Sequence, residues 1–97
     1  MEKRNNKYRI HLQELELRDG TPSDKSLEFE FNNHDNIFSI IENMEERQLL
    51  ENKADDVEFI IGLKLFSEVM IRNRNHPLFE ELAPAFKNFM MKLKKGV

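Results

Sequence analysis

The longest predominantly apolar stretch of the chain lies between Asp55 and Asn75, with the sequence DDVEFIIGLKLFSEVMIRNRN. At the helical spacing of about 100° per residue, one broad arc collects Val69, Phe66, Phe59, Met70, Leu63, Ile60 and Ile71. Val57, Ile61 and Leu65 fill much of the opposite side. Because a helix that is apolar nearly all round is a buried one, the pattern predicts a buried central helix.

A different pattern, with period two, precedes this helix. Tyr8, Ile10 and Leu12 alternate with polar residues, which is typical of a half-buried strand. Leu15 and Leu17 continue with the opposite parity, which predicts a β-bulge near residues 13–14.

Residues 18–26, RDGTPSDKS, are turn formers, and a second alternating run follows them. That run places Leu27, Phe29 and Phe31 on one face. The two runs predict an antiparallel β-hairpin of residues 8–17 and 27–32. A lone hairpin is marginally stable in water, so we expect helices to cover its apolar face.

Two further helices are predicted around the central one. The polar run 33–36 offers N-caps for a helix that places Ile37, Phe38, Ile40, Ile41 and Met44 on one face and frays near residues 47–48. Asp55 and Glu58 fit a capping box at the start of the central helix. Gly62 inside that helix predicts the close approach of another backbone, because glycine there costs about 1 kcal/mol.

The last helix is predicted to begin at His76-Pro77, where proline is harmless. Its apolar residues recur at spacings of three and four, as Phe79, Leu82, Phe86, Phe89 and Leu93. Pro84 lies inside this pattern and predicts a kink or a break near residues 80–84.

The predicted fold is therefore α+β, an N-terminal antiparallel β-hairpin followed by three helices (ββααα) with the central helix buried. We expect a single domain over residues 1–97, with residues 1–6 frayed. Leu27, Phe29 and Phe31 are expected to contact Phe59, Leu63 or Phe66, and Phe66 is expected in the core.

Charge is distributed unevenly along the chain. The formal net charge is −3, residues 1–9 carry +3, residues 87–97 carry +4, and the body between them carries −10. A patch of Lys3, Arg4, Lys92, Lys94 and Lys95 could bind nucleic acid, but an acidic body argues against it. We expect no nucleic-acid binding.

The residue inventory excludes several classes of chemistry. The chain has no cysteine, hence no disulfide, thiolate metal site or cysteine nucleophile. The three histidines, His11, His34 and His76, have no helical i,i+4 pairing, and His34 and His76 suit helix caps better than a metal. With neither a signal-peptide pattern nor an apolar run of about 20 residues, we expect a cytoplasmic bacterial protein without membrane association, metal or cofactor.

The most concentrated polar feature follows the central helix. Lys64, Glu68 and Arg72 are spaced four apart, and Arg74, Asn75 and His76 come next. One interpretation is an exposed strip of ion pairs worth about 0.2–0.5 kcal/mol each. The alternative is a site for a small anion or a partner carboxylate at the Arg72–His76 corner.

Three runs of the sequence resemble a known family. NHDNIF (33–38), GLKLFSEVM (62–70) and RNHPLFEELAPAFKNFMMKLK (74–94) are similar to the small bacterial family known as domain of unknown function 3861. The resemblance extends from YRI in the first strand to the last lysines. It implies a single-domain protein of about this length. The family has no known functional residues that could be assigned to positions of this chain.

Two functional hypotheses follow. The first is a non-enzymatic binding or protein-interaction module, since packing accounts for the apolar residues and no catalytic constellation remains. The alternative is a small anionic-ligand binder or minor enzyme that uses the Arg72–His76 corner. The open strand edge from Tyr8 to Leu17 further predicts a homodimer, since unpaired strand edges recruit another strand.

Overall fold

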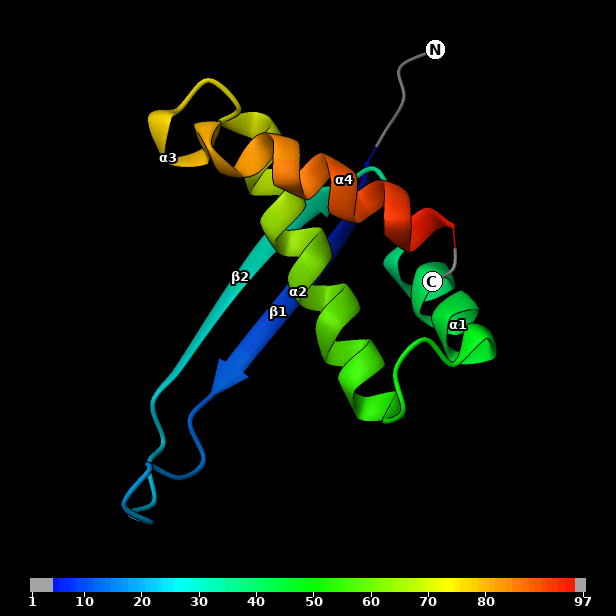
Figure 1. The fold of residues 1–97 in the computed structure, drawn as a ribbon. Coiled ribbons are helices and arrows are strands. Elements are labelled where there is room, and N and C mark those ends of the chain that lie inside the picture. The colour runs from blue at the N-terminus through cyan, green and yellow to red at the C-terminus, as the bar shows by residue number, and fades with distance from the viewer. Residues whose placement is uncertain (1–4, 96–97) are drawn as a thin grey trace. The chain divides into compact units, whose positions relative to one another are not determined.

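The computed structural model describes residues 5–95 and contains a two-stranded antiparallel sheet and four helices within them. The elements are β1 (Asn6–Gln13), β2 (Ser26–Asn33), α1 (Ile37–Arg47), α2 (Lys53–Arg72), α3 (Pro77–Glu80) and α4 (Leu82–Lys94) (Figure 1). They fall into two compact units, residues 1–35 with the hairpin and residues 36–97 with the helices. The α+β class and the order of hairpin and helices are as predicted.

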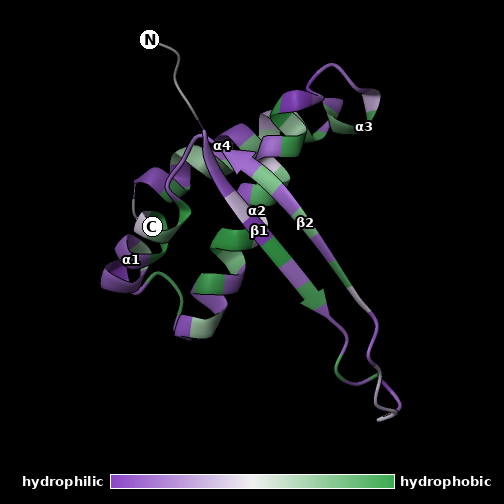
Figure 2. Ribbon diagram, turned by 180° about the vertical axis from the view of Figure 1, so that it is seen from behind, coloured by the Kyte–Doolittle hydropathy of each residue, from purple (hydrophilic) through white to green (hydrophobic). Residues whose placement is uncertain are grey.

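The hairpin pairs its apolar residues with one another across the strands. Tyr8 lies opposite Phe31, Ile10 opposite Phe29, and Leu12 opposite Leu27. The rings of Tyr8 and Phe31 are 5.4 Å apart. Alternation of apolar and polar residues is visible along β1 (Figure 2). Because the three pairs share one face, cross-strand packing of aromatic and aliphatic side chains stabilises the hairpin.

The first strand ends earlier than predicted, and the extra residue of the hairpin lies on the other strand's side. Regular pairing stops at Gln13, opposite Ser26, and an isolated bridge then joins Glu16 to Pro22. The register therefore slips by one residue, with the extra residue on the returning segment 23–25 and not at residues 13–14. Leu15 and Leu17, whose parity suggested the bulge, are both exposed.

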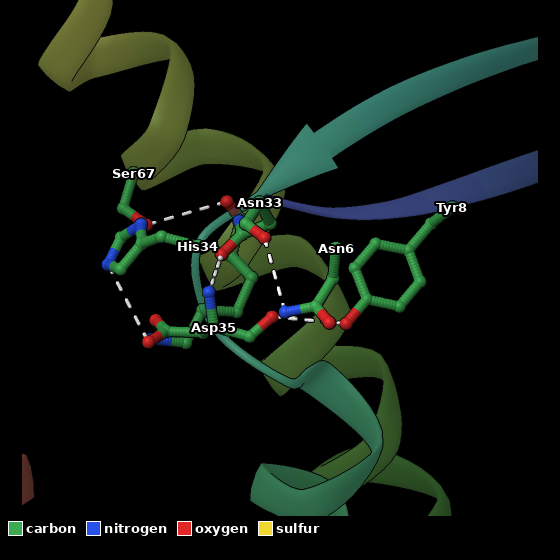
Figure 3. A network of polar contacts seen from close by, with 7 residues as sticks. Asn6, Tyr8, Asn33, His34, Asp35 and Ser67 are labelled. Atoms are coloured by element: carbon green, nitrogen blue, oxygen red, sulfur yellow. Dashed lines mark hydrogen bonds and ion pairs between the residues drawn. The ribbon is translucent and has the colours of Figure 1, made fainter. Parts of the chain in front are cut away.

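Asn6, predicted to fray, is part of β1. Its Nδ2 lies 3.5 Å from the carbonyl oxygen of Asn33, its cross-strand partner (Figure 3). The Tyr8 hydroxyl donates to the carbonyl of Asp35 at 3.0 Å, and Asn33 Oδ1 accepts from the Asp35 N–H at 2.9 Å. These bonds hold the end of β2 to the start of β1. Residues 1–4 lie outside the described part of the chain.

The first helix begins and ends near its predicted limits. Asn36 is the N-cap, and its side chain accepts a hydrogen bond from the Ser39 N–H at 3.1 Å. Gln48 is the C-cap, with a left-handed backbone at φ 50°. Ile37 and Met44 are buried as predicted, whereas Phe38 is exposed. His34 is not a helix cap; its Nε2 lies 3.6 Å from Asp35 Oδ1.

Two predictions about α2 are wrong. Its N-cap is Asn52, whose side chain accepts from the Ala54 N–H at 2.8 Å, so Asp55 lies inside the first turn and forms no capping box. Gly62 marks no close backbone approach, since a Cβ added there would meet nothing within 4 Å. A glycine can thus stand in an open helix face without a packing reason, and sequence alone does not separate the two cases.

The last predicted helix is divided in two. His76 caps α3, its Nδ1 accepting from the Leu78 N–H at 3.0 Å, with Pro77 at the start of the helix. α3 ends at Glu80 and α4 starts at Leu82. Pro84 has no N–H to bond the carbonyl of Glu80, four residues earlier. This missing bond explains the break within the predicted interval.

The helical unit is built around α2. Ile60 and Leu63 of α2 are buried, as are Ile37 and Met44 of α1. Val57, Phe59, Ile61, Leu65 and Met70 of α2 are half-buried. Phe66 is 39% exposed, more than a core residue would be, although its ring contacts two other aromatic rings.

Candidate functional site

Aromatic side chains join α2 to the last two helices. The Phe66 ring centre lies 5.7 Å from that of Phe86 and 6.1 Å from that of Phe79, both edge to face. Phe59, two turns earlier on α2, lies 6.1 Å from Phe89. Because residues seven apart share a helix face, Phe59 and Phe66 both meet aromatic rings of the C-terminal helices.

An apolar cavity lies beside the Phe59–Phe89 contact. Its volume is about 330 Å³, within the range of small-ligand sites. The lining residues are Leu49, Leu50, Phe59, Phe89, Lys92 and Leu93. Lys92 is the one charged residue among them. The first two lie in the link between α1 and α2.

A smaller cavity of about 120 Å³ lies between α1, α2 and α4. Ile40, Met44, Ile60, Leu63, Met90 and Leu93 form its apolar walls. Three basic residues, Arg47, Lys64 and Lys94, complete the lining. None of the lining residues is acidic, and Leu93 belongs to both cavities. The helical unit therefore combines apolar space with a concentration of positive charge.

Arg47 is held in place at the end of α1. Its Nη2 donates to the carbonyl oxygen of Leu93 at 3.0 Å, and its Nη1 lies 3.9 Å from Met44 Sδ. A guanidinium carries five N–H donors in a planar fork, so further donors are left for an anion. The sequence treated residues 47–48 only as a fraying helix end. In the sequence, the lysines near the end of the last helix were considered only as part of a nucleic-acid patch.

The predicted polar site is only partly assembled. Lys64 lines the smaller cavity and is half-buried, and Glu68 is half-buried one turn later. Arg72, Arg74, Asn75 and His76 are exposed where α2 passes into α3, and they line neither cavity. His76 Nδ1 is occupied as a helix cap. The six residues thus fall into two places along α2 and its C-terminal connection.

Ion pairs of the hairpin perturb one carboxyl group. Arg9 contacts Glu28 at 2.9 Å and Glu30 at 2.8 Å, and Lys7 contacts Glu30 at 3.3 Å. Hydrogen bonds from Arg9 and then from Lys7 hold the pKa of Glu30 below its ordinary value. The polar face of the hairpin is therefore a solvated ion-pair network.

Two other kinds of site are absent from residues 5–95. No group of three or more His, Cys, Asp or Glu side chains there could hold a metal ion. No helix in this range is long and apolar enough to cross a membrane.

Comparison with known proteins places the chain in a family. The model of a domain of unknown function with a solved structure, DUF3861, matches residues 6–95. The chain is also similar to a protein of unknown function from Pectobacterium atrosepticum, whose crystal structure is 37% identical with a TM-score of 0.82, over 94% of this chain and 98% of that one. No curated protein matches. These descriptions name no activity, and the match confirms the resemblance seen in the sequence: the chain belongs to the DUF3861 family.

Proposed function

We propose that the protein is a small non-enzymatic interaction module that forms a homodimer through the hairpin edge, from Tyr8 to Leu17. The observation that carries the proposal is the exposure of apolar side chains on the hairpin: Leu12 is 62% exposed, Leu27 54% and Phe29 43%. These residues belong to adjacent cross-strand pairs and so form one continuous surface. Exposed apolar patches of this kind are typical of interaction surfaces.

The open strand edges support the same proposal. The sheet of the described residues has two strands, so each strand has one side without a strand neighbour. A second copy that pairs edge to edge would satisfy those N–H and C=O groups and build a four-stranded sheet. Lys7 and Arg9 on β1 form ion pairs with glutamates of β2, which reduces the repulsion between like charges in a symmetric pair of β1 strands.

Light scattering on the eluted protein, from about 10 to several hundred µM, tests the dimer. We expect a mass of twice 11.6 kDa at the upper concentrations. In the dimer, the apolar faces of the two hairpins would form one continuous surface. Leu12→Lys would place a charge on that surface and should shift the equilibrium to the monomer. Gln13→Lys, on the opposite face, is the matched control and should still dimerise. A mass of 11.6 kDa at every concentration would refute self-association.

The Arg72–His76 corner is a second proposal, for a small anion or a partner carboxylate. It is supported by five consecutive exposed polar residues, from Arg72 to His76, two of them arginines. A thermal-shift screen against anionic metabolites tests it, with the Arg72→Ala/Arg74→Ala variant as control. Equal stabilisation of this variant would refute the corner as the site.

We also propose that the module acts in the cytoplasm of a bacterial cell. A chain without cysteine does not depend on an oxidising compartment for its fold. Fractionation of cells that express the tagged protein tests the location, and recovery with the periplasmic or the extracellular fraction would contradict it.

A further inference from the structure

Two of the cavities in the helical unit share Leu93 in their lining and differ in chemistry. The larger one is apolar except for Lys92, and the smaller one is bordered by Arg47, Lys64 and Lys94. Neither contains an acidic side chain. A ligand that matches both needs a hydrocarbon part and a negative charge close to each other.

We propose that these cavities bind a medium-chain carboxylate, with its hydrocarbon chain in the larger cavity and its carboxylate beside Arg47 and Lys94. Volume sets the size of the chain. A methylene group needs about the space of a water molecule in the liquid, roughly 30 Å³, so 330 Å³ admits about ten carbons. The smaller cavity, at 120 Å³, has room for a carboxylate group and water.

The basic side chains around Leu93 are the reason to expect an anionic head group on the ligand. Lys92 and Lys94 flank Leu93 and make no ion pair within residues 5–95. The bond from Arg47 Nη2 to the Leu93 carbonyl holds the guanidinium beside a residue that lines both cavities. A carboxylate there would accept charge-assisted hydrogen bonds, which are stronger than neutral ones. A neutral or cationic amphiphile would leave Lys92 and Lys94 without a counter-charge.

Decanoate below its micellar concentration is the probe, titrated into the full-length protein by calorimetry. We expect saturable binding of one molecule per chain. Acetate, which has the head group without the chain, should bind at least about a hundredfold more weakly, since each buried methylene adds several-fold to affinity. Decyltrimethylammonium, with the chain and the opposite charge, should not compete.

Variants locate the site. Lys92→Gln/Lys94→Gln removes two exposed cations and should weaken decanoate binding about three- to tenfold, as expected for partly solvated ion pairs. Leu50→Glu places a carboxylate against the hydrocarbon chain and should abolish binding. Lys53→Gln/Lys87→Gln removes the same charge from exposed positions of α2 and α4 that line neither cavity, and it should bind like the unmodified protein. A well-dispersed amide NMR spectrum establishes that each variant is folded.

Several results would overturn the proposal: no binding at millimolar decanoate, equal binding of acetate, or equal weakening by the two double variants. In the last case the anion is attracted by charge in general and not by this site. The proposal is independent of self-association. A variant such as Leu12→Lys should keep decanoate binding whatever its oligomeric state, so the two ideas can fail separately.

Discussion

The main-chain N–H of Leu50 donates a hydrogen bond to Oδ1 of Asp56 at 3.1 Å, and the Asp56 residue is only 1% exposed. The bond ties the link after α1 to the first turns of α2. Asp56 Oδ2 is buried with no hydrogen-bond partner among the described residues. A buried carboxylate near a helix N-terminus is favoured by the helix dipole. The hydrogen bond from Leu50 and the dipole of α2 therefore both stabilise the buried Asp56 side chain.

Asp56→Ala should therefore destabilise the protein by about 1–3 kcal/mol, because the Leu50 N–H of this part-buried bond loses its acceptor. Asp55→Ala removes the same charge from an exposed position in the same turn and serves as the control. We expect a smaller loss there, about 0.3–1 kcal/mol from the dipole alone. Urea denaturation measures both. Equal losses would mean that the bond to Leu50 contributes nothing.

Gly62→Ala is expected to stabilise the protein by about 1 kcal/mol. The new Cβ would meet no atom within 4 Å, so only the higher helix propensity of alanine acts. A rise in the denaturation midpoint at constant slope would establish the gain. Destabilisation would indicate that the open face at Gly62 is covered in solution, as by a second copy.

Gln48→Gly is expected to add about 0.5–1 kcal/mol of stability. Gln48 has φ 50°, a conformation that costs a residue with a Cβ about 1 kcal/mol and costs glycine nothing. Part of the gain is offset by the greater freedom of glycine in the unfolded chain. Gln48→Ala keeps the strain and is the control. A loss of stability in the glycine variant would show that the Gln48 side chain has a stabilising role.

The ion pairs of Glu30 predict a pH dependence. The pKa of Glu30 is lower in the folded protein than in the unfolded chain, so its stabilising contribution is complete above the ordinary glutamate pKa, about 4.3. The contribution is lost as the pH falls through the folded pKa. Glu30→Gln should therefore show a smaller fall in stability between about pH 5 and pH 3 than the unmodified protein. Urea midpoints across this range test it, and identical slopes would contradict it.

Local patterns predicted most of the fold because local physics determines it. The alternation from Tyr8 to Leu12 and the proline at residue 77 each require one backbone conformation, and both hairpin and helix start were found. The end of β1 was missed, since the register slip depends on the returning segment around Ser23. The cavity between α1, α2 and α4 was not predicted either. Arg47 and Lys94 are 47 residues apart in sequence, and only tertiary packing brings them to one cavity.

Substitution of Phe66 measures how much the aromatic contacts between α2 and the last two helices contribute to stability. Its 39% exposure lowers the expected cost of Phe66→Ala to about 2–3 kcal/mol, below the 3–5 kcal/mol typical of a fully buried phenylalanine. A double-mutant cycle with Phe86→Ala should give a coupling of about 0.5–1.5 kcal/mol, because the rings meet edge to face at 5.7 Å. Met91, which is 51% exposed, provides the control cycle, in which the effects should add. Additivity in the Phe66–Phe86 cycle would mean that α4 is not held to α2 by this contact.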